Sequence, residues 1–517
     1  MVNGILIAIL LILLWIVLIY RLAPAIKRSR HFSLLGPALM VKSPKNRGFL
    51  DKFSKIFPKE FTSRVAVAIV LLTMVAAFAF LFYEIYLTIT VRVAVSEPVS
   101  SYLALPGINP FIPIFYGTMA LIIGVVIHEI MHGVISRKHN ITVRSVGALF
   151  FVIPVGAFVE PDEKEITEAS PVVRRRIFAA GPATNIVLSF IFFILLIMIM
   201  APMAQVIHNG DYLESTQPQI SSLHNLSGSE LISFGNYSGE NLSNIAYASH
   251  IAPGTVVNFS VFNGKSTSTY ETYAGVAIDS LLSGFPAYSS SLRSGDIIVR
   301  IQNSTIYNIN TLNDVLDNIT PGTNISVYYV NASTIASGSS VHSIRIITAS
   351  KYSYYEKYYP LQNSPSYRNQ SFLGISVDYS GLLYIPMSEA KSLVFGNYVF
   401  SGFPDGFIGF IILPLEGLSP VPQSLASLFS TPLGGTFWII TNSFYWLFWI
   451  NFLLGLTNAL PLFILDGGQF FKDTLTISSR HKSLKFLNEK RIRDISNFFG
   501  ALVFLMLLWI LIVPRIG

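Results

Sequence analysis

The stretch Leu121-Ile-Ile-Gly-Val-Val-Ile-His-Glu-Ile-Met-His-Gly133 decides the fold, because it places ionisable side chains in the inner half of an apolar, membrane-spanning segment. His128 and His132 are four residues apart, so a helix turns both imidazoles to one face. Glu129 lies beside them, where a general base for a metal-activated water is needed. An ionisable cluster inside an apolar span is costly, which favours a functional role. The stretch therefore predicts a zinc site in a transmembrane helix.

A chance match to the His-Glu-x-x-His pattern is the competing interpretation, since such matches also occur in soluble helices. Histidine is rare in this chain, with nine residues, and the other seven lie outside the apolar segments or at an edge of one. This distribution favours the zinc site over the chance match.

The composition is typical of an integral membrane protein with a less hydrophobic insert. Hydrophobic residues make up 52% of the 517 and charged residues 12%, about half of the share in soluble chains. The net charge of +7 comes from basic residues beside apolar segments, which is the positive-inside pattern and excludes nucleic acid as a partner. Cysteine is absent, which excludes disulfides, thiolate catalysis and cysteine ligands for zinc.

Six apolar segments are long enough to cross a bilayer, so we predict an α-helical polytopic membrane protein with about six transmembrane helices. The first has no basic leader and no cleavage site, and we expect it to be retained as a span. The basic loops place the zinc motif near the cytoplasmic side. The predicted spans are Val2–Tyr20, Val65–Tyr86, Phe111–Ser136, Ile177–Met200, Thr436–Leu465 and Ile495–Val513.

Two shorter apolar segments cannot cross the membrane as helices. Ser145–Val159 is broken by glycine and proline, so we expect a β-hairpin or a re-entrant loop sheltered beside the site. Phe407–Pro414 is bounded by proline and acidic residues, and we expect it to lie at the membrane interface.

A β-rich exterior insert is predicted where the composition changes to Ser, Asn, Tyr, Thr and Gly. Nine Asn-x-Ser/Thr sequons lie there, from Asn225 to Asn369, which supports an exterior location. An internal repeat pairs Glu230-Leu-Ile and Pro253-Gly-Thr with Asp296-Ile-Ile and Pro321-Gly-Thr. The second copy looks like a PDZ domain, which captures an extended peptide by strand addition. We expect one or two PDZ-like domains; the alternative is one β-rich domain with a coincidental repeat.

Six parts follow from these boundaries. They are an N-terminal transmembrane pair with a basic cytoplasmic loop, the first half of a catalytic membrane core, a degenerate PDZ-like module, a PDZ-like module, an interfacial segment and the second half of the core. Their ranges are 1–110, 111–206, 207–281, 282–388, 389–434 and 435–517, respectively.

A hydrolytic zinc ion takes three protein ligands and leaves one position for water. Asp466 is the only acidic residue deep in the fifth segment, so it is the candidate third ligand; the alternative is a helix-end aspartate that meets water. Pro461 can kink that helix to aim Asp466. We expect Glu129 to relay the proton and an amide to stabilise the oxyanion, with Asn458 preferred over Asn185. Both asparagines could instead serve helix packing.

These residues resemble the site-2 protease family of intramembrane zinc metalloproteases. The resemblance covers roughly residues 111–310 and 435–475. It rests on His128-Glu129-x-x-His132, on Asn458-x-x-Pro461-x-x-x-x-Asp466-Gly467 and on a PDZ insert between them, and Ala180-Gly181-Pro182-x-x-Asn185 is similar to another family segment.

The resemblance implies one zinc ion bound by His128, His132 and Asp466, with Glu129 as the catalytic acid and base and Asn458 positioning the substrate. It implies cleavage of a transmembrane helix within the bilayer after another protease has trimmed the exterior part. The expected partners are therefore a transmembrane protein substrate and membrane lipid.

Two other functions use part of the same pattern. A zinc transporter would also place histidine and aspartate in membrane helices, but it would need neither Glu129 nor a peptide-binding exterior module. A catalytically silent membrane scaffold would bind peptides through its PDZ modules, but it would have no use for Glu129 as a base.

Overall fold

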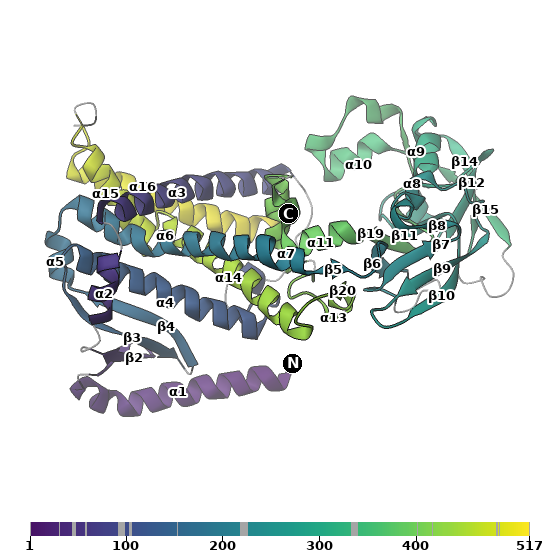
Figure 1. Ribbon diagram of the computed structural model, residues 1–517. Helices are drawn as coiled ribbons and strands as arrows, with labels where there is room; N and C mark the ends of the chain where they lie inside the picture. Colours follow the sequence, from purple (N-terminus) through teal and green to yellow (C-terminus); the bar gives the residue numbers. More distant parts are fainter. Residues whose placement is uncertain are drawn as a thin grey trace. The chain divides into compact units, whose positions relative to one another are not determined.

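The computed structural model describes residues 2–29, 31–43, 48–56, 59–90, 99–102, 106–151, 153–217, 226–331, 340–400, 402–415, 417–481, 484 and 486–515 (Figure 1). Two compact units account for the chain. The membrane unit comprises residues 1–88, 95–195 and 443–517, and the insert unit comprises residues 89–94 and 196–442.

Five of the six predicted spans are confirmed as helices long and apolar enough to cross a membrane. Their outward faces carry exposed apolar side chains such as Leu72 and Leu505, which a bilayer solvates and water does not. A further helix, α1 (Val2–Arg28), covers the first predicted segment, and its role as a sixth span stays a prediction. The five are α3 (Lys59–Thr90), α4 (Ile114–Lys138), α6 (Pro171–Leu195), α14 (Gly435–Ala459) and α16 (Glu489–Ile512).

The fifth predicted segment, Thr436–Leu465, is wrong as a single helix. Helix α14 ends at Ala459, and α15 (Asp466–Ser478) begins at the aspartate itself. Pro461 lies between them and has no N–H to continue the α-helical hydrogen bonds. Asp466 therefore occupies the first turn of a separate helix, where its carboxylate is favoured by the helix dipole.

The predicted hairpin at Ser145–Val159 is confirmed as two antiparallel strands, β3 (Val143–Phe151) and β4 (Ile153–Pro161). Two strands from the N-terminal loop, β1 (Phe32–Leu35) and β2 (Ala38–Ser43), extend them to a sheet of order β1-β2-β3-β4. Strand β4 therefore forms one edge of this sheet, and it packs along α4 (Figure 1). The sheet lies beside the helix that carries the histidines.

Two short helices complete the charged end of the membrane unit. Helix α2 (Gly48–Ile56) packs on α4, and α5 (Glu163–Glu168) follows β4. Asp162 caps α5 by accepting hydrogen bonds from the backbone N–H groups of Lys164 and Glu165, which satisfies two otherwise unpaired donors.

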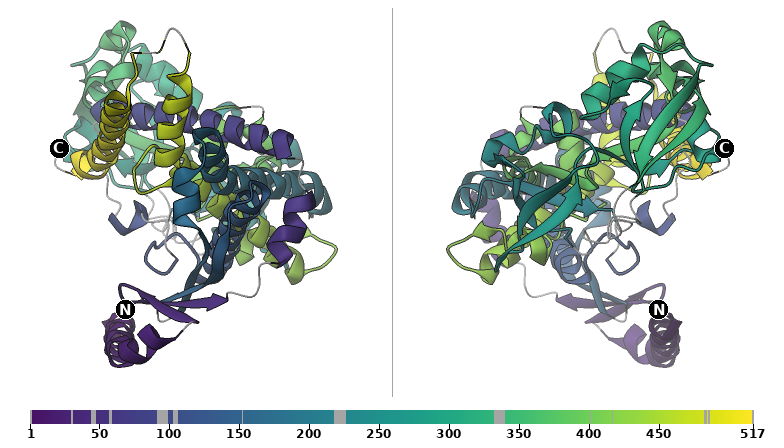
Figure 2. Two further views of the ribbon diagram at one scale, coloured as in Figure 1. Left: turned by 90° about the vertical axis from the view of Figure 1, so that its left-hand side faces the viewer. Right: turned by 90° about the vertical axis from the view of Figure 1, so that its right-hand side faces the viewer.

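The insert unit is built on one long antiparallel sheet, and most of its strands are labelled in Figure 1 and seen from two further sides in Figure 2. The strand order is β10-β9-β7-β6-β19-β18-β11-β12-β14-β15, with β8 beside β7 and β13 beside β12. The strands are β6 (Asp211–Thr216), β7 (Glu230–Phe234), β8 (Tyr237–Ser238), β9 (Val256–Phe262), β10 (Thr267–Tyr273), β11 (Val276–Leu281), β12 (Ile297–Ile301), β13 (Ser304–Thr305), β14 (Asn324–Val330), β15 (Val341–Ile347), β18 (Ile375–Tyr379) and β19 (Leu382–Pro386).

The order of elements repeats in the insert. The series β6-β7-β8-α8-β9-β10 is followed by β11-β12-β13-α9-β14-β15, where α8 is Ile245–Ala248 and α9 is Ile309–Asp317. Each series has its own core, one around Phe234 and Phe259 and the other around Ile298 and Val327. The sequence repeat therefore corresponds to a structural repeat, and the sheet joins its two halves through β18 and β19.

Smaller elements connect the two repeats to the rest of the insert. Among the sequon asparagines, Asn225 lies outside the described residues, whereas Asn236, Asn241 and Asn258 are exposed. Helix α12 (Asp405–Ile412) occupies most of the segment predicted to be interfacial. The remaining α-helices and strands are α7 (Ala201–Met203), α10 (Lys351–Tyr358), α11 (Met387–Phe395), α13 (Gln423–Ala426), the pair β5 (Gln205–Val206) and β20 (Phe429–Ser430), and the pair β16 (Ala349–Ser350) and β17 (Ser371–Phe372).

Candidate metal centre

Three predicted ligands meet at one point in the membrane unit. The Nε2 atoms of His128 and His132 lie 3.1 Å apart, and Asp466 Oδ2 lies 3.0 Å from each of them. The histidines come from one face of α4, as their four-residue spacing predicts, and Asp466 comes from the start of α15. Residues 338 positions apart thus form one cluster of possible metal ligands.

The geometry of the cluster fits a zinc ion. Zinc bonds of about 2.0–2.1 Å in a tetrahedron separate the ligand atoms by about 3.4 Å, and the three observed separations are 3.0–3.1 Å. Both imidazoles are buried. Two neutral nitrogens and one carboxylate oxygen form a donor set that zinc prefers in hydrolytic sites.

Gly181 of α6 forms one wall of the cluster. A Cβ atom at this position would lie 2.5 Å from the Nε2 atoms of both His128 and His132. No real side chain tolerates such a contact, so the helix backbone can approach the two imidazoles only through glycine. The Gly181-Pro182 segment thus has a direct structural role beside the ligand atoms.

The Nδ1 atoms of the two histidines, which face away from the cluster, also have hydrogen-bond partners. The Nδ1 atom of His132 lies 2.8 Å from the carbonyl oxygen of Ile177, so Nδ1–H donates to it and Nε2 is left free to bind a metal. The Nδ1 atom of His128 lies 3.1 Å from the side-chain amide of Asn185. Both contacts come from α6 and fix the direction of the rings.

The side-chain amide of Asn185 fits better when its two ends are exchanged. With the nitrogen facing His128, its Oδ1 atom is buried without a partner. Amide nitrogen and oxygen are assigned from the hydrogen-bond network. With Oδ1 turned to His128, the amide accepts the Nδ1–H proton and leaves Nε2 free for a metal, as Ile177 does for His132.

The side chain of Glu129 extends from α4 to the edge strand of the sheet. Its Oε2 atom accepts a hydrogen bond of 3.2 Å from the backbone N–H of Val159 in β4. The predicted base thus contacts strand β4 from the helix that carries both histidines. Asn458 lies near the end of α14 and donates its amide to the carbonyl oxygen of Leu454, 3.0 Å away and one turn earlier.

An ion pair holds the helix that presents Asp466. Arg174 of α6 binds Asp473 of α15, with 2.5 Å between Nη2 and Oδ1 and 3.2 Å from Nε to each carboxylate oxygen. The remaining Nη1 group of Arg174 donates to the carbonyl oxygens of Thr167 and Ala169. In the sequence, Arg174 counts only toward topology, and a second aspartate seven residues after Asp466, two helical turns on, is the signal that could have revealed the pair.

Comparisons with known proteins agree with this arrangement. Residues 116–507 match the family model described as peptidase family M50. A segment of 80 residues is 38% identical to the uncharacterized protein MJ0971 of Methanocaldococcus jannaschii. That segment covers 15% of this chain and 21% of the relative, so the chain matches about a fifth of the relative's length.

Proposed function

Since the chain belongs to peptidase family M50, the site-2 protease family, we propose that it is an intramembrane zinc metalloprotease that cleaves transmembrane helices. The family is one of membrane metalloproteases. The observation that carries the proposal is the convergence of His128 and His132 of α4, a helix apolar enough to cross a membrane, with Asp466 at the start of α15, next to the predicted base Glu129.

His128, His132 and Asp466 would hold the zinc ion, and the ion would polarise the scissile carbonyl and lower the pKa of a water. Glu129 takes the proton from the attacking water and delivers it to the leaving amine. For this step its carboxylate leaves the Val159 N–H, a contact of 3.2 Å that a substrate can replace. Asn185 acts as a positioning residue for His128, and Asn458 remains our candidate for the oxyanion donor.

A substrate helix has to unwind before it can be cut, because every backbone group of a helix in lipid is already hydrogen-bonded. Strand β4 is an edge strand of its sheet, and its Val159 N–H already faces Glu129. We propose that an unwound segment adds to this edge as a further strand, which satisfies its backbone donors and acceptors. The scissile bond then lies beside the base.

The insert and the topology complete the proposal. The repeated order of elements with two cores supports tandem PDZ-like modules, and we place them outside the membrane, with α1 as a sixth span and the zinc site near the cytoplasmic side. We further propose that a second protease trims the exterior part of the substrate first, and that the intramembrane cut releases a cytoplasmic regulator.

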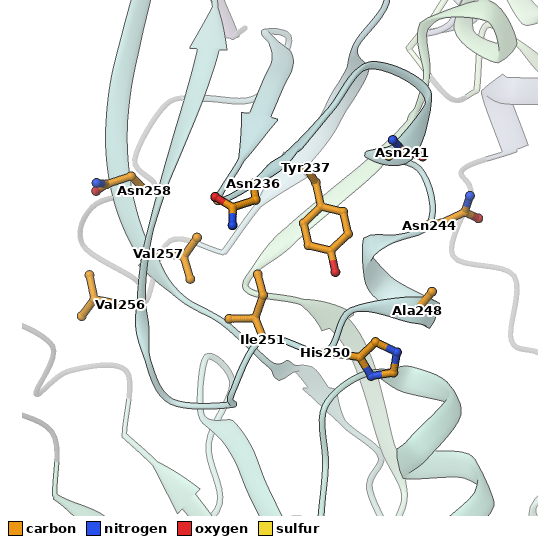
Figure 3. Close-up of a pocket in the computed structure, with 11 residues that line it drawn as sticks. Asn236, Tyr237, Asn241, Asn244, Ala248, His250, Ile251, Val256, Val257 and Asn258 are labelled. Carbon is orange, nitrogen blue, oxygen red and sulfur yellow. The ribbon is translucent and has the colours of Figure 1, made fainter.

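A binding role without catalysis is the second candidate, and a cavity in the first repeat supports it. The cavity has a volume of about 1040 Å³. Figure 3 shows that Tyr237, Ile251 and four asparagines surround it. None of its eleven lining residues is acidic, lysine or arginine, so its chemistry suits an uncharged peptide segment. A scaffold would need this cavity but not the arrangement of Glu129 and the metal ligands.

Incubation of the purified full-length protein with a model transmembrane substrate in detergent tests the main proposal. We expect cleavage by the wild type, loss of cleavage on zinc chelation and its recovery when zinc is restored. The Glu129→Gln variant should keep one zinc per chain and lose cleavage, since only the base has changed. Absence of bound zinc, or cleavage by the Glu129→Gln variant at the wild-type rate, would refute the proposal.

A further inference from the structure

Helix α2 has two different faces, and the residues that the structure describes cover one of them and leave the other exposed. Leu50 and Ser54 are buried against α4. Phe49, Phe53 and Ile56 are 37%, 48% and 64% exposed. These three side chains recur at positions i, i+4 and i+7, so they form one apolar stripe along the helix.

Two hydrogen bonds hold α2 at the charged end of α4. Asp51 accepts a hydrogen bond of 2.6 Å from Nε of Arg137, and the backbone oxygen of Ser54 accepts one of 2.6 Å from Nζ of Lys138. Arg137 and Lys138 are the last residues of α4, which is apolar enough to span. Helix α2 is therefore fixed beside the charged end of α4 (Figure 1), which is the end where a span meets the headgroups.

Helix α2 carries two exposed lysines, and its acidic residue, Asp51, is paired with Arg137. Lys52 and Lys55 are exposed. At about 100° per residue, Lys52 flanks the apolar stripe and Lys55 lies on the side opposite Phe53. An apolar stripe with one lysine at its edge and another on the opposite side of the helix fits the boundary between acyl chains and anionic headgroups. Contact with water is favourable for the lysines, but it is unfavourable for two phenylalanines and an isoleucine on one face.

We infer that α2 is a lipid-binding helix that lies in the interface of the bilayer, with its apolar stripe among the acyl chains and its lysines on anionic headgroups. The inference rests on the membrane spans and not on the proposed proteolysis. Its occupant is a bilayer surface that carries negatively charged phospholipid. A second copy of the chain or a soluble protein on the same stripe is the outcome that would refute it.

The lipid contact is connected to the metal cluster through one turn of α4. Leu50 packs against Gly133, where a Cβ atom would lie 3.1 Å from its side chain and 2.8 Å from Val159. Gly133 follows His132 directly, and Val159 donates to Glu129. A displacement of α2 by the lipid surface would therefore press on the two elements that hold a metal ligand and the base.

The absence of cysteine makes the inference directly testable on the whole protein. Single variants Phe49→Cys, Phe53→Cys, Ile56→Cys, Lys52→Cys and Lys55→Cys each carry one spin label after reconstitution in vesicles. Collisions with oxygen, which concentrates in the acyl chains, and with a water-soluble nickel chelate report the surroundings of each label. We expect oxygen to dominate at the three stripe positions and the chelate to dominate at Lys55.

Two results would overturn the inference. Greater access of the chelate than of oxygen at Phe49, Phe53 and Ile56 would place the stripe in water, and protection from both reagents would show that protein covers it. Neither readout depends on catalysis, so the proposed protease activity can fail without affecting this result.

Vesicles of phosphatidylcholine alone and of phosphatidylcholine with phosphatidylglycerol test the role of charge. We expect the label at Phe53 to gain oxygen access when the anionic lipid is added. In a variant that also carries Lys52→Glu and Lys55→Glu, the oxygen access of this label should not change when the anionic lipid is added. Each lysine near an anionic surface favours binding to that surface about fivefold, and this contribution is then lost. Equal oxygen access in both vesicles with both lysines present would overturn the assignment of anionic headgroups.

Discussion

At the scale of single residues, the cluster depends on the absence of a side chain at Gly181. Gly181 lies where any side chain would enter the space of the two Nε2 atoms. We predict that Gly181→Ala lowers bound zinc from one equivalent to a small fraction, because the added Cβ would lie 2.5 Å from both ligands. Metal analysis of the purified variant measures this directly.

The matched control is another glycine of a spanning helix. Gly435 begins α14, and a Cβ atom there would contact nothing within 4 Å. Gly435→Ala should therefore keep its full zinc content. A Gly181→Ala protein that binds zinc as tightly as the wild type would show that the imidazoles do not hold the ion in the arrangement described.

Asn185 gives a second prediction at this scale, because it orients His128 from the side away from the cluster. Loss of such an outer partner typically lowers metal affinity by about 10- to 100-fold. We expect Asn185→Ala to show this loss in a zinc competition titration and Asn185→Asp to recover most of it, since a carboxylate also accepts the Nδ1–H proton.

Asn451 of α14 provides the comparison for Asn185. It is also fully buried and donates to the carbonyl oxygen of Leu447 in its own helix, 2.7 Å away. Asn451→Ala should lower stability and leave zinc affinity unchanged. Equal zinc affinities for the Asn185→Ala variant and the wild type would exclude the orienting role.

The sequence predicted which three residues form the cluster, but not the groups that support them. His128 and His132 follow from helical spacing, and Asp466 follows from the scarcity of acidic residues at membrane depth. Their supports are a backbone carbonyl at Ile177 and the missing Cβ of Gly181. Every residue has a backbone carbonyl, and a glycine's neighbours depend on packing between distant segments, so neither is visible in a local pattern.

At the scale of elements, α15 matters because its first residue is the third ligand of the cluster. The pair between Arg174 and Asp473 ties this helix to α6, which also orients both histidines. We predict that Asp473→Ala destabilises the membrane unit by about 3 kcal/mol, since it leaves a largely buried guanidinium without its carboxylate. Thermal unfolding in detergent should show a lower midpoint, together with weaker zinc binding.

An exposed ion pair serves as the reference for this loss. Lys164 and Glu168 of α5 are 3.9 Å apart, and both side chains are mostly exposed. Glu168→Ala should change stability by less than about 0.5 kcal/mol. If Asp473→Ala has an effect as small as that, the pair does not fix α15.

The boundaries of elements show where apolar runs mislead. Thr436–Leu465 is continuous in hydrophobicity, yet the helix ends at Ala459 because Pro461 cannot extend its hydrogen bonds. The β3–β4 hairpin was predicted because glycine and proline interrupt its apolar pattern. Strands β1 and β2 were not, since they join the sheet through the pairing of β2 with β3, about a hundred residues away, which local periodicity cannot show.

At the scale of the whole molecule, the chain consists of a membrane unit with apolar helices and a less hydrophobic insert unit. The membrane unit buries His128 and His132 within an apolar helix, whereas the insert unit builds two cores on one sheet. The repeat of the insert was visible in short motifs because each copy needs the same turn before the same strand. The joining of the two copies into one sheet was not visible, because β18 and β19 follow both copies in the chain and lie between them in the sheet.

The buried acids of the insert give it a pH dependence of definite sign. Burial raises the pKa of Glu230 from 4.5 to about 7, against the opposing hydrogen bond from the Gly210 N–H, and burial raises the pKa of Asp378 from 3.8 to about 7. At pH values between the ordinary pKa of each acid and its raised pKa of about 7, the carboxyl group is protonated in the folded insert and ionised in the unfolded chain. Its stability therefore falls as pH rises from about 4.5 to about 7 and levels off above.

We predict that the insert of the full-length protein unfolds at a higher temperature at about pH 5 than at about pH 8. Protease digestion after brief heating, followed by mass spectrometry of insert peptides, measures the midpoint at each pH. Glu230→Gln keeps an acceptor for the Gly210 N–H but cannot ionise, so the difference between the two midpoints should shrink. A higher midpoint at pH 8 than at pH 5, or an unchanged difference in the variant, would mean that Glu230 is ionised in the folded insert and held by compensating charges.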